Sequence, residues 1–387
     1  MAYPKKSVLA LSPEKNVNIS PVKLKPKLSN EKDAKKQSNE KINIDRTTLK
    51  IDWQKGINDS IDKKMKEFVE KVYKIESEKR LGPHFLANLI NIPNRDQKFT
   101  NFLAFPGKNR NPDVFCLETT RVKLKNSSSE RDYIHANYIS IENSKKAYIV
   151  TQHPMTNTIE DFWSMVVNEH VEVIVSLTNL VGPDFPQFYP KSKYAFVEFG
   201  NYQVICKSVI QGSLKYGPLL YNLEIVRNGC SHGANVQLMK YSHWAKNLVP
   251  VRTKVVLSIL KQINKTKFFG PVLVQCETGI NQSAALIYCD AMISLLLDNK
   301  SVDIDTVFQN IRKQRASMLS QRIHFIYSIY VVLDFIRMRF KNNKTMPEVV
   351  KIIENIEKPI IQEFSKYLSV ETNDMRTVSP TSTELLF

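Results

Sequence analysis

Long apolar runs are missing from this 387-residue sequence. No segment reaches the roughly 18–20 consecutive apolar residues that a membrane-spanning helix requires. The start contains only the apolar patch Val8–Leu11 behind two lysines, which is too short for the core of a secretory signal peptide. We therefore expect a protein of the cytoplasm, with the nucleus as a second location, that is not secreted through a signal peptide.

The sequence contains few cysteines, and their spacing does not arrange them in pairs. The five cysteines are odd in number and show neither a Cys-x-x-Cys pair nor the Cys/His spacing of a zinc site. This argues against a disulfide framework and for a reducing compartment, and we expect neither a metal nor a cofactor. Cys276 lies at the end of an apolar segment. The other four are interpreted as small core residues, namely Cys116, Cys206, Cys230 and Cys289.

Acidic residues are outnumbered, with 38 Asp and Glu against 55 Lys and Arg, and the net charge is +17. Such an excess favours acidic partners such as phosphoproteins, nucleic acid or an anionic membrane, although a solvated basic surface without a dedicated partner fits equally well. Residues 1–58 are basic, with isolated apolar positions, and predict a disordered arm. Nucleic-acid binding by this arm is disfavoured, because residues 1–50 offer Tyr3 as their one aromatic side chain for base stacking.

Hydrophobic periodicity divides the remaining chain into a domain at 59–342 and an extension at 343–387. Helices are predicted from Ile61 onward and at 83–92, 159–169, 283–297, 304–314 and 323–339. Strands are predicted at 133–139, 147–151, 171–177, 194–199, 204–211, 219–226, 236–241 and 271–274. Strands bracketed by helices indicate an α/β (α+β) fold with a mixed sheet. After Asn343, a proline-interrupted amphipathic stretch predicts a helical extension that packs on the domain, followed by a disordered tail at 378–387.

The segment around Cys276 joins a strand to a helix. Val272–Val274 is typical of a buried strand, residues 275–282 form a loop, and Ser283 begins an apolar helix. A loop between a strand end and a helix N-terminus directs backbone N–H groups and the positive end of the helix dipole at one point, which favours an anion. A cysteine at the base of such a loop would have a stabilised thiolate. Many α/β folds also bury a cysteine at a strand end without using it.

Residues 274–283 resemble the protein tyrosine phosphatase signature, His-Cys-x-x-Gly-x-x-Arg-Ser/Thr, at Cys276, Gly279 and Ser283. The resemblance covers about residues 60–340 and implies a single phosphatase-like domain, a highly twisted mixed sheet flanked by helices on both sides. Further segments resemble the family in the expected order, namely the Lys-Asn-Arg loop at 108–114 with Asp113, the strand at 132–139, the block at 147–166, the strand at 171–178, and the helix region with Arg312, Arg315 and Met318.

The residues that perform the family's chemistry are mostly replaced. In the family, a cysteine thiolate attacks phosphorus and an arginine six residues later clamps two phosphate oxygens. An aspartate on a mobile Trp-Pro-Asp loop protonates the leaving oxygen, and a glutamine positions the hydrolytic water. This chain keeps Cys276. By resemblance, Gln282 stands at the arginine position, Lys246 at the aspartate position and His324 at the water-positioning glutamine.

Other positions of the phosphate loop and its rim also depart from the family. Gln275 replaces the histidine before the cysteine, and Asn111 replaces the tyrosine that grips the substrate's ring. Glu277 adds a negative charge that disfavours both a thiolate and a phosphate. The resemblance assigns the substrate and phosphate-loop positions to Gln275, Glu277, Thr278, Gly279, Ile280, Asn281, Gln282, Ser283, Asn111, Asp113, Trp244 and Lys246.

These replacements predict a pseudophosphatase, a monomeric noncatalytic module that binds and sequesters phosphotyrosine-containing or other signalling proteins. Two alternatives stay open. A weakly active phosphatase would use Cys276 through a phosphocysteine intermediate, and a scaffold or nucleic-acid contact would use the basic arm. A degenerate phosphatase with this Lys-, Asn- and Ile-rich composition also resembles the phosphatase-like families that parasitoid-wasp bracoviruses deliver into host insect cells.

Overall fold

A computed structural model describes residues 58–90, 97–125, 132–141, 146–178, 182–212, 214, 217–244, 247–250, 252–265 and 268–375, with side chains to Phe364. The predicted arm at 1–58, apart from Asn58, and the predicted tail at 378–387 lie outside these residues. Within the described part of the chain, no helix is long and apolar enough to cross a membrane.

Within the described residues, the centre of the domain is a mixed sheet of nine strands in the order β1-β2-β3-β9-β4-β8-β7-β6-β5. Strands β3, β9, β4 and β8 run parallel, and the strands on either side of them pair antiparallel. Parallel strands are buried on both faces, which explains their continuous apolar runs. The strand bounds are β1 Arg121–Lys123, β2 Tyr133–Ser140, β3 Ala147–Gln152, β4 Val173–Ser176, β5 Phe196–Phe199, β6 Tyr202–Gln211, β7 Leu219–Arg227, β8 Ala234–Lys240 and β9 Val272–Cys276.

Helices cover both faces of this sheet. Side chains alternate along β9, so that Val272, Val274 and Cys276 join the core with α5, α6 and α8, whereas Leu273 joins the core with α4. The helix bounds are α1 Asp59–Glu78, α2 Leu81–Asn88, α3 Thr100–Ala104, α4 Ile159–Asn168, α5 Thr253–Lys265, α6 Gln282–Leu297, α7 Ile304–Gln314, α8 Arg322–Asn343 and α9 Pro347–Met375, with 3-10 turns at Pro106–Lys108 and Thr156–Thr158.

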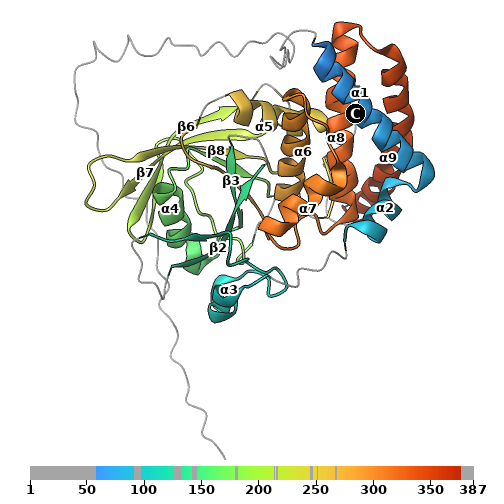
Figure 1. The fold of residues 1–387 in the computed structure, drawn as a ribbon. Coiled ribbons are helices and arrows are strands. Elements are labelled where there is room, and N and C mark those ends of the chain that lie inside the picture. The colour runs from blue at the N-terminus through green and yellow to red at the C-terminus, as the bar shows by residue number, and fades with distance from the viewer. Residues whose placement is uncertain are drawn as a thin grey trace, which may run out of the picture. The chain divides into compact units, whose positions relative to one another are not determined.

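The α1, α8 and α9 helices pack together beside the sheet (Figure 1). The Arg339 guanidinium of α8 forms a buried ion pair with Asp62 of α1, with 2.7 Å between Nε and Oδ1. The apolar stripe that was predicted to pack after Asn343 lies on α9, and its members Val349, Ile353 and Ile356 are buried with α1 and α8. Pro359 lies inside this helix.

The predicted fold class, an α/β arrangement with a mixed sheet and helices on both sides, is confirmed. Besides the 3-10 turns, three elements have no counterpart among the predicted ones, namely the five-residue helix α3, the 13-residue helix α5 and the three-residue strand β1. The signal for α5 was present, because its buried residues Val255, Val256, Ile259 and Leu260 recur at helical spacing. The core interpretation of Cys230 is wrong, since it is exposed in the turn between β7 and β8.

Candidate functional site

The loop at residues 277–281 emerges between two parallel neighbours of the sheet. Strand β9 ends at Cys276, β3 and β4 flank it in parallel, and α6 begins at Gln282. In parallel sheets, ligands bind outside the carboxyl ends of the strands. Cys276 pairs with Gln152 of β3 and is fully buried at the base of this loop.

Gly279 gives the loop its backbone turn. Its φ is +72°, in the left-handed region that glycine tolerates best. A Cβ atom at this position would lie 2.6 Å from the carbonyl oxygen of Thr151, which belongs to backbone that cannot move aside. The close approach of the loop to β3 therefore requires a residue without a side chain.

Arg315 supports the loop through hydrogen bonds to its backbone. This fully buried guanidinium donates from Nε to the Gly279 carbonyl at 2.9 Å and from Nη2 to the Thr278 carbonyl at 3.0 Å. Because two successive carbonyls accept from Arg315, these hydrogen bonds fix the backbone path of the loop.

Two side chains of β2 complete the coordination of Arg315. Nη1 donates to Asn137 Oδ1 at 2.7 Å, and Nη2 lies 3.1 Å from Nδ1 of His135. His135 Nε2 lies 2.8 Å from the Val114 carbonyl and donates to it, which leaves Nδ1 as the acceptor for Arg315. Burial and the Arg315 charge lower the pKa of His135 to about 3, so the ring is neutral. His135 and Asn137 were not among the predicted site residues.

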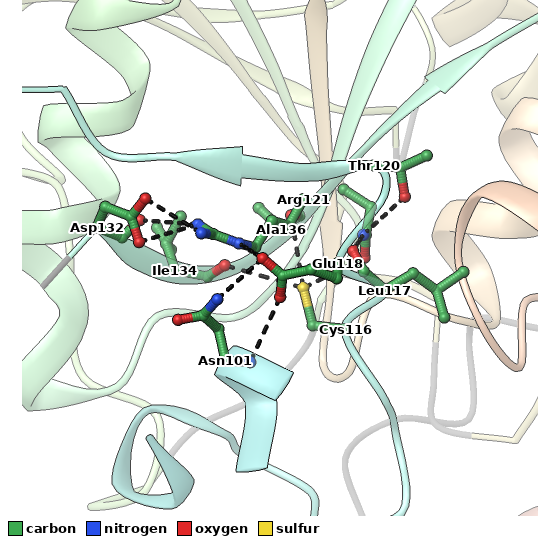
Figure 2. Close-up of polar contacts among 10 residues, drawn as sticks. Asn101, Cys116, Leu117, Glu118, Thr120, Arg121, Asp132, Ile134 and Ala136 are labelled. Atoms are coloured by element: carbon green, nitrogen blue, oxygen red, sulfur yellow. Dashed lines mark hydrogen bonds and ion pairs between the residues drawn. The ribbon is translucent and has the colours of Figure 1, made fainter. Parts of the chain in front are cut away.

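Cys116 supports this network and is not a second nucleophile. Its sulfur lies 3.7 Å from the Ala136 carbonyl (Figure 2). The same sulfur lies 3.6 Å from Asn137 Oδ1. Burial raises the pKa of the Cys116 thiol to about 11. Beside it, Arg121 pairs with Glu118 at 2.6 Å and Asp132 at 3.1 Å, which ties the strand edge to the preceding loop (Figure 2).

The helix end of the loop carries neutral polar side chains. Gln282, at the first position of α6, is 8 % exposed. Asn281 Oδ1 accepts a hydrogen bond from Ser320 Oγ at 3.0 Å, and the Ile280 carbonyl accepts from the Leu319 N–H at 2.7 Å. Ser283 Oγ is buried without a hydrogen-bond partner in the described part of the chain. No cationic residue stands at these positions.

The strand end of the loop is anchored to β3 and β4. The Glu277 carbonyl accepts from the His153 N–H at 3.0 Å. Gln275 Nε2 donates to Ser176 Oγ at 3.0 Å. The Glu277 carboxylate acts on Arg110, where it opposes the lowering of the arginine pKa by burial. Part of the negative charge predicted to repel a phosphate is thus offset by a neighbouring cation.

The segment around Asn111, which the resemblance assigned to substrate recognition, has a small polar side chain at its tip. Asn111 Oδ1 accepts from the Asp113 N–H at 2.7 Å, and Asp113 is exposed. The backbone N–H of Arg110 donates to Gln152 Oε1 at 2.9 Å, and its guanidinium donates to the His153 carbonyl at 3.1 Å. The loop is therefore fixed to β3, directly beside Cys276.

The segment with Trp244 lies against the start of α8. Trp244 is buried, its Nε1 donates to the Leu248 carbonyl at 2.8 Å, and Gln321 Nε2 donates to Asn247 Oδ1 at 2.6 Å. Lys246 lies outside the described residues. The segment thus has a buried anchor at Trp244 and a polar contact at Asn247.

The resemblance placed His324 at the water-positioning glutamine, but the structure places its side chain in the core. His324 is fully buried, and its ring stacks on Trp244 with 6.1 Å between centroids. Neither ring nitrogen has a hydrogen-bond partner in the described part of the chain, and burial lowers the pKa of the ring to about 3. His324 therefore cannot position water at the loop. Ser320, four residues earlier, is the side chain that contacts the loop at Asn281.

These features define a domain in which a cysteine ends a central parallel strand and a buried arginine shapes the loop between that strand and a helix. The sequence profile described as protein-tyrosine phosphatase matches residues 105–334, which is more than half of the chain. The chain belongs to the protein tyrosine phosphatase family.

Relatives with a similar sequence include receptor and non-receptor members of the family. Tyrosine-protein phosphatase 69D of Drosophila melanogaster is 28% identical over 266 residues, which are 65% of this chain and 18% of the relative. Tyrosine-protein phosphatase non-receptor type 20 of Rattus norvegicus is 26% identical over 64% of this chain and 58% of its own length. Human receptor-type tyrosine-protein phosphatase zeta is 31% identical over 57% of this chain and 10% of its own length. The chain thus spans less than two thirds of each of these relatives.

Replacing Gly279 with alanine should destabilise the domain by at least about 2 kcal/mol, because the residue combines a left-handed φ with a clash against backbone. Gly107→Ala is the matched control, since its Cβ would meet nothing within 4 Å, and we expect a change within about 0.5 kcal/mol. Urea unfolding of both variants measures the difference. Equal stabilities would contradict the tight approach of the loop to β3.

Proposed function

We propose that the chain is a pseudophosphatase that binds phosphotyrosine-containing signalling proteins and does not hydrolyse them at a useful rate. The observation that carries this proposal is the side chain at the first position of α6. Gln282 is neutral, whereas the loop that it closes keeps its glycine turn and its Arg315 support. The binding frame is intact, and the charge that would stabilise a transition state is missing from it.

The expected loss of rate is large. Removal of a general acid costs about 10²–10⁴-fold, and removal of one preorganised donor to a developing oxyanion costs about 10²–10³-fold. Lys246, at the expected acid position, is a poor proton donor near neutral pH, because an unperturbed lysine has a pKa of about 10.4. Even if the two losses are far from additive, little turnover is left.

Binding a phosphate requires fewer protein groups than hydrolysing a phosphate ester does. The backbone N–H groups of residues 277–282 and the N-terminus of α6 can hold a phosphate, and the net charge of +17 favours acidic partners. The partners that fit are phosphorylated signalling proteins of the cytoplasm or nucleus, in a host cell or in the protein's own cell. A weakly active phosphatase is the second candidate, because Cys276 is retained at the base of the loop.

A binding assay and a single-turnover assay with the same phosphotyrosine peptide test this proposal. We expect salt-sensitive binding that the unphosphorylated peptide does not show. With protein in excess over peptide, phosphate release should equal that of Cys276→Ala. Release that disappears in Cys276→Ala would support the weak phosphatase instead. Absence of phosphate-dependent binding would overturn the proposed function.

A further inference from the structure

A partly buried lysine ends strand β8 next to the phosphate loop. The Lys240 ammonium donates to the carbonyl and the hydroxyl of Thr178 and lies 3.4 Å from Ser176 Oγ. All of these acceptors are neutral, and no carboxylate forms an ion pair with Lys240 in the described part of the chain. A buried cation normally has an anionic partner. Lys240 is thus a positive charge that the described residues do not neutralise.

Hydrogen bonds connect Lys240 to the residue before Cys276. In the sheet, Lys240 of β8 pairs with Ser176 of β4, which pairs with Gln275 of β9. Ser176 Oγ contacts both neighbours, because Gln275 Nε2 donates to it at 3.0 Å. Ser176 therefore links the ammonium to the side chain of Gln275, the residue before Cys276.

The groups around Lys240 leave its charge in place at neutral pH. Burial and the charge of Lys191 lower the pKa of Lys240 to about 8. Directly after β3, burial, followed by the charges of Arg110 and Lys240, lowers the pKa of His153 to about 4, so this neighbour is neutral. At pH 7 most molecules carry the Lys240 ammonium, and at pH 9 most do not.

We propose that Lys240 supplies the fixed positive charge for a phosphate monoester bound in the loop at 277–282, where Gln282 supplies none. This inference rests on the proposed function. The charge is connected to the base of the loop through Ser176 and Gln275, so it would attract a dianion without forming the bidentate clamp that catalysis needs. In a partly buried site, a unit charge several ångströms from an anion is sufficient for at least about a tenfold effect on the affinity.

A purely structural role for Lys240 predicts a different result. If the ammonium only links β8 to the end of β4, its loss would lower the free energy of unfolding. Its protonation state would then not change the affinity of the protein for a phosphopeptide. Lys240→Arg keeps the charge at every pH used here, because arginine is always protonated. Lys191→Met is the matched control for the loss of one exposed lysine charge nearby.

The experiment measures binding of one phosphotyrosine peptide to the full chain between pH 7 and pH 9. The peptide stays a dianion over this range, because the second phosphate pKa is about 6. We expect Lys240→Met to bind at least about tenfold more weakly at pH 7 and Lys191→Met to change affinity by less than about threefold. Affinity of the unmodified protein should fall toward pH 9, and that of Lys240→Arg should stay constant.

Three outcomes of the binding experiment test the role of Lys240. A pH-independent affinity of the unmodified protein, or equal affinities of the unmodified protein and a folded Lys240→Met, would overturn the role of Lys240 and leave the proposed function standing. If Lys240→Met does not fold, the pH profiles of the unmodified protein and Lys240→Arg decide alone. If the unmodified protein does not bind the peptide at all, the proposed function fails together with this inference.

Discussion

The double variant Gln282→Arg/Lys246→Asp should hydrolyse a phosphotyrosine peptide at least about 10³-fold faster than the unmodified protein. The arginine would restore a bidentate clamp on two phosphate oxygens, and the aspartate would restore a proton donor for the leaving oxygen. The substitution can act because the rest of the loop is in place. Arg315 still fixes the carbonyls of Thr278 and Gly279, so the new guanidinium enters a loop with a defined backbone.

Single-turnover phosphate release at high protein concentration measures this gain. The matched control adds Cys276→Ser to the double variant and should return the rate to background, because the thiolate is the nucleophile. The single variants should each give smaller gains than the pair. No cysteine-dependent release from the double variant would mean that the retained scaffold cannot support the chemistry, for example because Ser320 or Glu277 also blocks it.

Replacing Arg315 with methionine should cost about 3–5 kcal/mol of unfolding free energy, because breaking a buried charged network leaves its partners unsatisfied. The side chain makes hydrogen bonds to Gly279, Thr278, Asn137 and His135, all in a buried environment. Without Arg315 the two loop carbonyls have no donor, so we expect phosphopeptide binding to disappear as well.

Urea unfolding gives the stability change, and the peptide-binding assay gives the functional one. Lys313→Met is the control, since this exposed lysine lies two residues earlier and its loss should change stability by no more than about 0.5 kcal/mol. A loss below about 1 kcal/mol for Arg315→Met would show that the loop is held by other contacts. If Arg315→Met is less stable but binds the peptide as well as the unmodified protein does, Arg315 stabilises the fold and is not needed for the shape of the loop.

The residues that give the loop its shape thus differ from the residue that is proposed to supply a positive charge to it. Gly279 and Arg315 give the loop its path, and neither depends on the residue at the arginine position of the family signature. The loss of charge at Gln282 therefore leaves the loop geometry intact. Lys240, on a strand two places away in the sheet, carries a charge that does not come from the loop at all.

The local pattern of apolar residues was sufficient to predict most of the helices and strands. The predicted helix at 304–314 coincides with α7, because its apolar residues keep one spacing and Asp303 caps its start through a 2.8 Å hydrogen bond to the Thr306 N–H. The strand at 271–274 was predicted from three consecutive apolar residues, and β9 extends two residues further to Cys276. Strand β1, with three residues, was too short to give a periodic signal.

Sequence position alone misled at His324. The order of residues after Arg315 placed it near the water-positioning glutamine, but helix α8 begins at Arg322 and turns His324 into the core against Trp244. Which face of a helix is buried depends on its packing partners, and Trp244 is 80 residues earlier in the chain. The contact of Ser320 with Asn281 has the same origin, since it joins segments 39 residues apart.

The sequence by itself predicted the family fold, a nucleophile position at Cys276 and the loss of the charged clamp at Gln282, because these predictions depend on residue identity and local spacing. Only the tertiary structure decided how the loop is supported and where a replacement charge lies. Arg315 meets His135 from a strand 180 residues away, and Lys240 meets Thr178 across 62 residues. Such contacts are set by strand order and register, which bring distant residues together only when the sheet has formed.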